Sequence, residues 1–179
     1  MTKPTETIHA LVAAGVTHVV GLPDNTSGPL FDALARHPTV RLVMVTREGE
    51  APAIATGLWM GGAAPLVLIQ NTGLLECGDA LRGTAVRVGA PIPIVITGRG
   101  YAKMARAGVD PHVERTRELL TRADIDSVAL LTEPTLDAWG IPFTRCAGDD
   151  DPVAALHATV DAARERGRPV ALVLARELV

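Results

Sequence analysis

Short apolar runs rich in Val, Leu and Ile alternate along this chain with longer segments whose apolar positions recur at helical spacing. The short runs lack a polar face, which is typical of parallel strands that helices cover on both sides. They predict six strands, at residues 17–21, 40–45, 65–70, 92–97, 143–146 and 170–174. The longer segments predict helices at residues 4–15, 28–36, 51–60, 75–86, 115–123, 130–139 and 152–166. This alternation predicts a doubly wound α/β fold, in which a parallel sheet of about six strands carries helices on both faces.

The length and composition bound the organisation of the chain. Its 179 residues, 47% of them hydrophobic, suffice for one sizeable core and are too few for two typical domains, so we expect a single domain over residues 1–179. Because only 3% of the residues are aromatic, the core must be aliphatic. A net charge of -3 without a stripe of Lys or Arg argues against nucleic-acid binding. The apolar runs are far shorter than the roughly 20 residues that cross a bilayer, and no apolar signal segment opens the chain, so we expect a cytoplasmic protein without a membrane partner.

Polar or glycine-rich loops follow four successive predicted strands. These loops are Gly21-Leu22-Pro23-Asp24, Arg47-Glu48-Gly49-Glu50-Ala51, Gln70-Asn71-Thr72-Gly73 and Thr97-Gly98-Arg99-Gly100. Parallel strands place their carboxyl ends at one edge of the sheet, where open α/β folds bind ligands. The sequence therefore predicts a site at this edge, with Glu48 following a strand that we expect to be buried. The segment 98–112 is predicted to be irregular, and irregular loops of that length are often lids or binding loops.

In order and spacing these motifs resemble the pyrimidine-binding, N-terminal domain of thiamine diphosphate-dependent enzymes, most narrowly the sulfopyruvate decarboxylase alpha subunit and phosphonopyruvate decarboxylase. The resemblance implies the pyrimidine-binding subunit of a decarboxylase, a lyase that uses thiamine diphosphate to act on a small 2-oxo acid. It also implies that Glu48 is catalytic. The first Glu of such a motif hydrogen-bonds N1′ of the cofactor's aminopyrimidine and favours the imino tautomer that removes the C2 proton. From the residues alone, Glu48 and Glu50 could instead be a solvated pair at a helix N-terminus.

Further residues receive roles from the resemblance. It implies cofactor contacts for Pro23, Asp24, Thr72 and Gly73, and substrate contacts for Asn25, Asn71 and His112. The residues themselves leave other interpretations open: an ordinary turn at Asp24 and Asn25, a helix cap at residues 71–73, and a mobile surface side chain at His112. Within the irregular segment, Tyr101, Lys103 and Arg106 could meet an anionic substrate or be solvated.

Four positions depart from the pattern of the family. Asn25 stands where the family has Ser, and Leu75, Glu76 and Asp79 stand where it tends to have Gly, Asn and Asn. A Leu cannot adopt the left-handed conformations that Gly allows, so the backbone near residue 75 could differ from the family's. These changes leave the identity of the 2-oxo acid open.

The motif that binds the metal in this family is missing from the chain. The resemblance implies that Mg²⁺ is held against the diphosphate by Gly-Asp-Gly and a downstream Asn, which supply the oxygen ligands that Mg²⁺ requires. The nearest strings, at residues 78–80 and 148–150, are not followed by an Asn. We therefore expect no metal ligands here, and expect a diphosphate-binding beta subunit with the Gly-Asp-Gly and Asn motif as partner in a heterodimer or heterotetramer. Cys77 and Cys146 have no companion cluster, which favours buried thiols over a metal or redox site.

Two other functions fit the same residues. One is a thiamine diphosphate-dependent carboligase subunit, because the same chemistry can join an aldehyde where a decarboxylase adds a proton. The other is a non-catalytic binding or regulatory subunit of the same fold. A nucleotide binder would be favoured by a P-loop or a dinucleotide fingerprint between a strand and a helix, and neither occurs.

Overall fold

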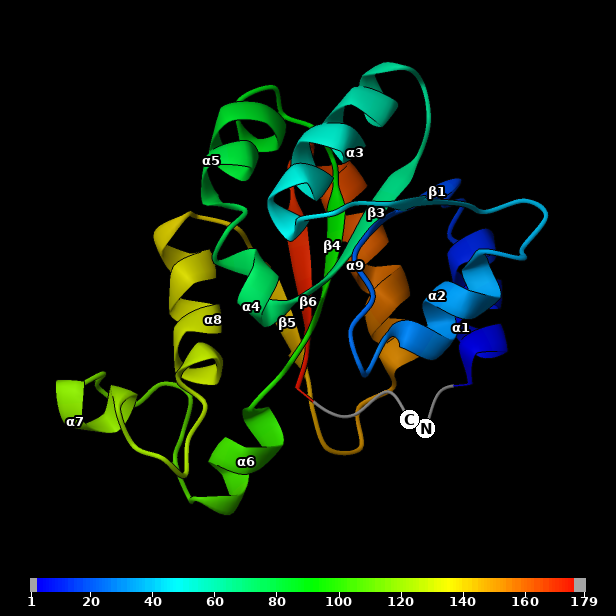
Figure 1. The fold of residues 1–179 in the computed structure, drawn as a ribbon. Coiled ribbons are helices and arrows are strands. Elements are labelled where there is room, and N and C mark those ends of the chain that lie inside the picture. Colours follow the sequence, from blue (N-terminus) through cyan, green and yellow to red (C-terminus); the bar gives the residue numbers. More distant parts are fainter. Residues whose placement is uncertain (1–2, 176–179) are drawn as a thin grey trace.

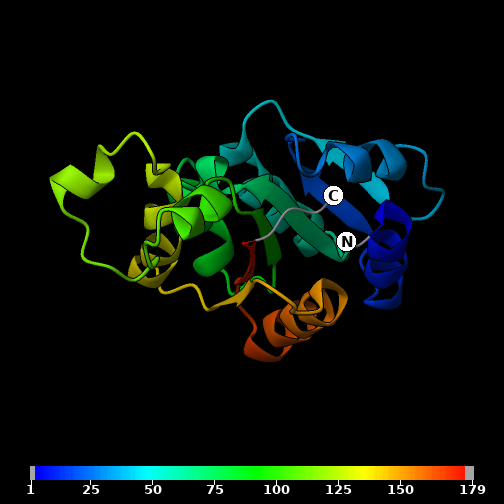
Figure 2. The same ribbon diagram turned by 90° about the horizontal axis from the view of Figure 1, so that it is seen from below.

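The sheet runs through the centre of the molecule and carries helices on both faces (Figures 1 and 2). A computed structural model describes residues 3–175. Within them six parallel strands are arranged in the order β2-β1-β3-β4-β6-β5. The strands are β1 (His18–Gly21), β2 (Arg41–Met44), β3 (Pro65–Gln70), β4 (Pro93–Thr97), β5 (Phe143–Cys146) and β6 (Val170–Leu174). The predicted doubly wound α/β fold is confirmed.

Alternate residues of the strands point to opposite faces, and each face has its own apolar cluster. In β3, for example, Leu66 and Leu68 belong to one cluster, whereas Val67 and Ile69 belong to the other. The first face is covered by α1 (Pro4–Ala13), α2 (Gly28–Leu34) and α9 (Pro152–Arg166). The second face is covered by α3 (Ala51–Met60), α4 (Asn71–Leu74), the π-helix η2 (Leu81–Val86) and α8 (Ser127–Ala138), and the short α5 (Gly78–Ala80) precedes η2. Both clusters are aliphatic, as the composition predicts.

The segment 98–112 differs from the prediction, because it contains the helix α6 (Tyr101–Arg106). Tyr101 and Met104, three residues apart, are both buried against the apolar cluster of the second face. These two side chains lie on one face of the helix, and that face packs on the core. The prediction of an irregular loop did not include this packing. The helix expected at residues 115–123 shrinks to α7 (Arg117–Leu120), which Thr116 caps by accepting a hydrogen bond from the Leu119 N–H at 3.2 Å.

Two further helices differ from the prediction in their extent. The helix expected at residues 75–86 begins earlier and is divided into α4, α5 and η2. The helix expected at residues 130–139 begins at Ser127, because Asp126 caps its first turn. That extension places Pro134 inside the helix, where a Pro is normally disfavoured.

The strand β2 is also less buried than predicted. It pairs with β1 alone and lies at the edge of the sheet, so its Met44 side chain is exposed. The buried side chains are Val40 and Val45, which flank the strand. The turn after β2 therefore lies at the open end of the sheet.

The carboxyl ends of β1, β3 and β4 meet at one edge, where Gly21 allows a close approach. A Cβ atom on Gly21 would lie 1.8 Å from the carbonyl oxygen of Leu68, so only glycine fits beside β3 at this point. Gln70 and Thr97 are register partners at the ends of β3 and β4. The loops that follow these strands are thus brought side by side. No helix in the described part of the chain is long and apolar enough to cross a membrane.

Candidate active site

Glu48 lies in a short 3-10 turn, η1 (Glu48–Glu50), between β2 and α3. The turn is closed by Glu50, whose Oε2 accepts hydrogen bonds from the Thr46 N–H at 3.2 Å and from the Thr46 hydroxyl at 3.3 Å. The two neighbouring carboxylates therefore differ. Glu50 is bonded within its own turn, whereas the partly buried carboxylate of Glu48 accepts no hydrogen bond from residues 3–175.

Gly73 lies directly against the Glu48 side chain. A Cβ atom at position 73 would come within 2.3 Å of Glu48 Cγ and 2.4 Å of its Cδ. The absence of a side chain at this position therefore makes room for the carboxylate. The structure brings the predicted residues Glu48 and Gly73 together, while their contacts with a cofactor stay a prediction.

Cys77 supports the same place from the protein interior. Its thiol donates weak hydrogen bonds to the carbonyl oxygens of Glu48 at 3.3 Å and Gly73 at 3.2 Å. Burial, together with the negative charges of Glu48 and Glu76, raises the pKa of this thiol to about 12. Cys77 is therefore neutral and unreactive near neutral pH. Cys146 is also buried and forms no disulfide, so the predicted buried thiols are confirmed.

Glu76 is bonded to the residues on both sides of Glu48. Its Oε1 accepts hydrogen bonds from Arg47 Nε at 2.7 Å and from Arg47 Nη2, and its Oε2 accepts one from the Gly49 N–H at 3.3 Å. The Arg47 guanidinium, followed by the Gly49 amide, lowers the pKa of Glu76 below its ordinary value. The sequence analysis noted Glu76 as a departure from the family and missed this contact. Opposite charges on two neighbouring loops were the available signal.

Asp24 joins the ends of three strands. Its Oδ1 accepts hydrogen bonds from the Thr26 N–H at 2.8 Å, the Ser27 N–H at 2.6 Å and the Ser27 hydroxyl at 2.9 Å. Its Oδ2 accepts bonds from Gln70 Nε2 at 3.2 Å and from the Thr97 hydroxyl. Burial acts to raise the pKa of Asp24, but these hydrogen bonds, that of Thr97 first, outweigh it and lower the pKa. The carboxylate thus closes the turn expected from the residues alone.

Asn71 is fully buried and its amide is satisfied inside the protein. Its Nδ2 donates to the Arg99 carbonyl at 2.9 Å and to the Thr132 hydroxyl at 3.1 Å, and its Oδ1 accepts from the Arg99 N–H at 3.1 Å. It therefore ties α4 to the loop after β4 and to α8. By contrast, Pro23, Asn25 and Thr72 are exposed at the same edge, and the Thr72 hydroxyl donates to Gln70 Oε1 at 3.1 Å.

His112 meets a buried carboxylate that the sequence analysis missed. Its Nε2 lies 3.5 Å from Oε2 of Glu133, which is only 2% exposed, while the His112 side chain is 63% exposed. The Tyr101 hydroxyl donates to Glu133 Oε1 at 3.0 Å, and Arg145 Nη1 lies 3.5 Å from the same atom. Burial and the Glu133 charge raise the pKa of Tyr101 well above its ordinary value. The expectation that Tyr101 could meet an anionic substrate from a loop is wrong, because its side chain points into the core.

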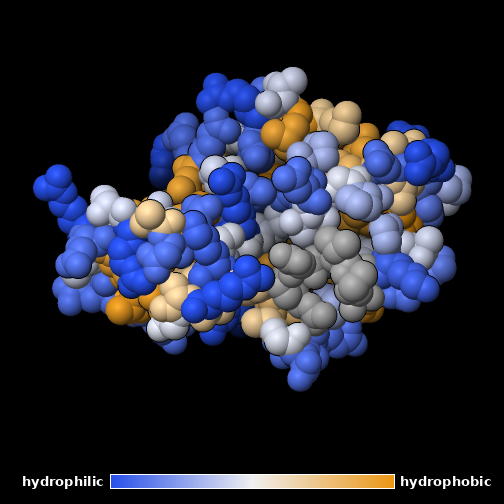
Figure 3. Space-filling model, turned by 60° about the horizontal axis from the view of Figure 1, so that its bottom comes forward, coloured by the Kyte–Doolittle hydropathy of each residue, from blue (hydrophilic) through white to orange (hydrophobic). Residues whose placement is uncertain are grey.

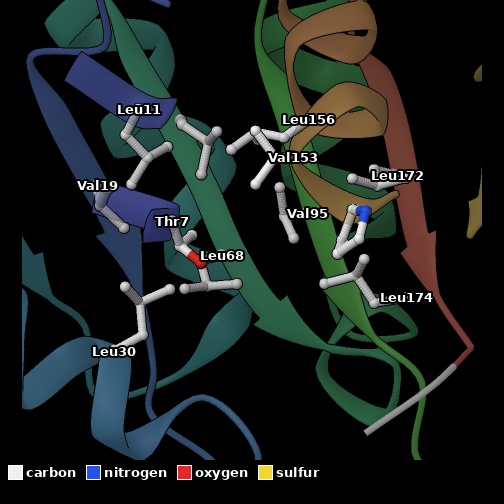
Figure 4. A pocket seen from close by; sticks show the side chains of 12 residues that line it. Thr7, Leu11, Val19, Leu30, Leu68, Val95, Val153, Leu156, Leu172 and Leu174 are labelled. Atoms are coloured by element: carbon white, nitrogen blue, oxygen red, sulfur yellow. The ribbon is translucent and has the colours of Figure 1, made fainter. Parts of the chain in front are cut away.

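An open hollow of about 610 Å³ lies beside the η1 turn. It is lined by Arg47, Gly49, Glu50, Ala53, Glu76, Asp79, Ala80, Gly83 and Thr84. The view toward the carboxyl edge of the sheet shows a mostly hydrophilic surface with scattered apolar side chains (Figure 3). A second cavity, of about 40 Å³, lies between α1, α9 and the opposite face of the sheet, where apolar side chains and Thr7 line it (Figure 4). The lining of the hollow beside η1 therefore includes Arg47 and the carboxylates of Glu50, Glu76 and Asp79, whereas Glu48 does not line it.

Glu48 and Gly73 fit the aminopyrimidine of thiamine diphosphate, because a carboxylate that accepts no hydrogen bond from residues 3–175 lies beside a glycine, which has no side chain. A metal ion is a different matter. In the described part of the chain, no group of three or more His, Cys, Asp or Glu side chains could hold one.

Comparison with known proteins places the chain among thiamine enzymes. Residues 3–116 match the family described as thiamine pyrophosphate enzyme, N-terminal TPP binding domain. The chain is 33% identical over 100 residues to a phosphonopyruvate decarboxylase of Streptomyces viridochromogenes, covering 56% of this chain and 25% of that protein. It is 31% identical over 117 residues to the sulfopyruvate decarboxylase subunit alpha of Methanococcus maripaludis, covering 65% of this chain and 70% of that one.

The likeness in fold extends further along the chain. The structure of a benzoylformate decarboxylase from Polynucleobacter necessarius superposes with a TM-score of 0.66 at 22% identity, covering 97% of this chain and 29% of that chain. The chain thus spans about a quarter of the length of the phosphonopyruvate decarboxylase that it matches.

Proposed function

The chain belongs to the thiamine pyrophosphate enzyme family through its N-terminal TPP-binding domain, and on that premise we propose that it is the pyrimidine-binding subunit of a thiamine diphosphate-dependent 2-oxo acid decarboxylase. We propose further that residues 1–179 form one such domain. The similarity to phosphonopyruvate decarboxylase and to the sulfopyruvate decarboxylase subunit alpha supports decarboxylation of a small 2-oxo acid with an anionic head group.

The free carboxylate of Glu48 is the observation that carries this proposal. Among the carboxylates in the loops after β1, β2 and β3, those of Asp24, Glu50 and Glu76 are all bonded within the protein, whereas Glu48 accepts no hydrogen bond from the described residues. A carboxylate that is partly buried and unbonded can share a proton with a ligand's ring nitrogen. Glu48 would therefore hold the aminopyrimidine by a hydrogen bond and exchange a proton with it. When bound, the cofactor supplies the electron sink for decarboxylation.

The other residues have supporting roles in the proposal. Gly73 leaves the space beside Glu48, and the exposed Pro23 and Thr72 lie at the same edge, where they can contact the cofactor. We assign substrate contacts to the exposed side chains of Asn25 and His112. Asn71 acts on the substrate pocket through the loop after β4, to which its buried amide is bonded.

A second chain completes the proposed site. We propose that a diphosphate-binding beta subunit carries the Gly-Asp-Gly and Asn motif and holds Mg²⁺ against the diphosphate. The name of the Methanococcus maripaludis relative, a subunit alpha, supports a partner. Exposed apolar side chains support it as well: Ile54 lies on α3, Leu75 directly follows α4, and Val86 and Val88 lie at the end of η2 and just after it. Such side chains can serve as contacts for a partner chain.

The substitution Glu48→Gln tests the proposal. It keeps the size of the side chain and removes its ability to carry the proton, so turnover of the assembled enzyme should fall by roughly 10² to 10⁴-fold. The matched control is Glu50→Gln, two residues away, because an amide oxygen can still accept the hydrogen bonds from Thr46. We expect this control to keep its activity and both variants to keep the thermal stability of the wild type. Decarboxylation by Glu48→Gln within about threefold of the wild type would refute the role of Glu48.

A further inference from the structure

The turn that carries Glu48 is held by a carboxylate from a neighbouring segment. Glu76 accepts two hydrogen bonds from the Arg47 side chain and one from the Gly49 backbone, so it is bonded to the residues immediately before and after Glu48. We propose that Glu76 is a positioning residue that sets the direction of the Glu48 carboxylate. This inference rests on the proposed function of Glu48.

Glu76 is not needed to form the turn itself. The turn is closed by the hydrogen bonds of Glu50 with Thr46, and the following helix α3 has Pro52 in its first turn, where a Pro is favourable. The contacts of Glu76 instead join this turn to the segment after α4. They fix where the turn lies, not whether it exists.

The same segment contacts Glu48 at two further points. Gly73 lies against the Glu48 side chain, and the Cys77 thiol donates to the Glu48 carbonyl oxygen. Residues 73–77 therefore reach Glu48 at its side chain, at its main chain and, through Glu76, at both flanking residues. A shift of the turn relative to this segment would move the carboxylate away from Gly73.

The ion pair of Glu76 with Arg47 is poorly explained by stability. The Arg47 side chain is 71% exposed and that of Glu76 33% exposed, and pairs of this kind add little to the free energy of folding. What a guanidinium bonded through two nitrogens provides is a defined geometry. Next to the proposed catalytic carboxylate of Glu48, a defined geometry of the turn would keep that carboxylate pointing in one direction.

Substitutions at Glu76 test the inference in the assembled enzyme. In Glu76→Ala the Glu48 side chain remains but its turn is released, so kcat should fall by roughly 10 to 100-fold while the KM for the 2-oxo acid changes little. Glu76→Gln keeps one acceptor oxygen, which can accept from Arg47, but its NH2 group cannot accept from the Gly49 N–H, so it should recover only part of this loss. The matched control is Glu165→Ala, since Glu165 is an exposed Glu on α9, at the opposite face of the sheet.

A second measurement does not depend on activity. In the free chain, the Gly49 amide proton should exchange faster with solvent in Glu76→Ala than in the wild type, and at the wild-type rate in Glu165→Ala. If Glu76→Ala fails to fold, Arg47→Lys serves as a milder variant. A Lys side chain cannot bond through two nitrogens, so this variant should also lower kcat.

The outcomes separate the two proposals. An inactive Glu48→Gln with a fully active Glu76→Ala would overturn the positioning role and leave the proposed function standing. A fully active Glu48→Gln would overturn the proposed function itself. Equal losses of kcat in Glu76→Ala and Glu165→Ala would also overturn the positioning role, because the effect would then be one of surface charge.

Discussion

The carboxylates at the edge of the sheet differ in what they are bonded to. Asp24, Glu50 and Glu76 each accept several hydrogen bonds from the protein, and each holds a turn or loop in place. Glu48 has the same chemistry but a different environment, with a glycine beside it and no donor among the described residues. A carboxylate that accepts no hydrogen bond from the protein can accept one from a ligand. A carboxylate that closes a turn already uses its oxygens to hold the backbone in place.

Asp24 leads to a prediction about acid stability. Its pKa is lowered in the folded protein, so near pH 4 the unfolded chain binds more protons, and the stability contributed by Asp24 is lost as the pH falls through the lower folded value. In Asp24→Asn we expect lower stability at neutral pH and a shallower loss of unfolding free energy between about pH 5 and pH 2, by at most about 1.4 kcal/mol per pH unit. Urea unfolding across this range measures it. Asp32→Asn, at an exposed position on α2, controls for the removed charge. If the unfolding free energy of Asp24→Asn fell with pH as steeply as that of the wild type, the prediction would be wrong. Such a result would mean that protonated Asp24 keeps its hydrogen bonds in the wild type.

The chemical groups of the site could be predicted from the sequence, but their partners could not. The order of loops after strands is local information, and it placed Glu48, Gly73 and Asp24 at the carboxyl edge of the sheet. The partners of Asp24 include Gln70 and Thr97, which are 46 and 73 residues away in the chain. Such contacts depend on which strands lie side by side, and no local pattern encodes that.

At the scale of elements, Glu133 joins four parts of the fold. It lies on α8 and meets Tyr101 of α6, His112 of the following loop and Arg145 of β5. A buried carboxylate is costly unless donors or opposite charges surround it, and these three side chains provide them. The cluster thereby fastens the segment 98–112 to the sheet.

The ionisation of Tyr101 reports on this cluster, because it is the chain's single tyrosine. Burial and the charge of Glu133 raise the pKa of its phenol, so the phenolate absorbance should appear at a higher pH than in free tyrosine, near 10. In Glu133→Gln the midpoint should move back towards the ordinary value. With the sign of this shift, stability from Tyr101 is present below about pH 10 and is lost as the pH rises towards the folded pKa.

Tyr101→Phe completes the experiment. Removing the hydroxyl leaves a buried acceptor with one donor fewer, so we expect a loss of about 1 to 3 kcal/mol in unfolding free energy and faster amide exchange across α6. Arg106→Ala, at an exposed position on the same helix, is the control. A wild-type Tyr101 that ionises near pH 10 would contradict the buried contact with Glu133.

The helices and strands were predicted correctly where the chain is apolar on both faces. They were not predicted correctly where a few tertiary contacts determine where a helix forms or begins. The strands β3, β4 and β6 are nearly continuous runs of buried residues, and their boundaries are close to the predicted ones. The helix α6 was missed because it is short and is stabilised by the packing of Tyr101 and Met104. The start of α8 was missed because the cap at Asp126 outweighs the presence of Pro134. These are tertiary effects, which override local preference.

At the scale of the whole molecule, the polar loops at the carboxyl edge of the sheet lie next to the hollow beside η1. The hollow next to η1 is open. The alternation of strands and helices predicted the fold class, since parallel strands need helical crossovers. The strand order did not follow from it. The last strand, β6, lies between β4 and β5, which places Arg145 of β5 within reach of Glu133.

The proposed partner leads to the last prediction, about cofactor binding. The free chain should bind thiamine diphosphate with Mg²⁺ at least roughly 10²-fold more weakly than the assembled enzyme, because it lacks two or more charge-assisted contacts to the diphosphate, worth about 3 kcal/mol together. Calorimetry on the chain alone, and then with a chain that carries Gly-Asp-Gly and a downstream Asn, measures the difference. Ile54→Asp, on the exposed face of α3, should prevent both assembly and tight binding. The control is Val12→Asp, because Val12 is also exposed but lies on α1 at the opposite face of the sheet, and this variant should affect neither. Tight, Mg²⁺-dependent binding by the chain as a monomer would show that the site is complete without a partner.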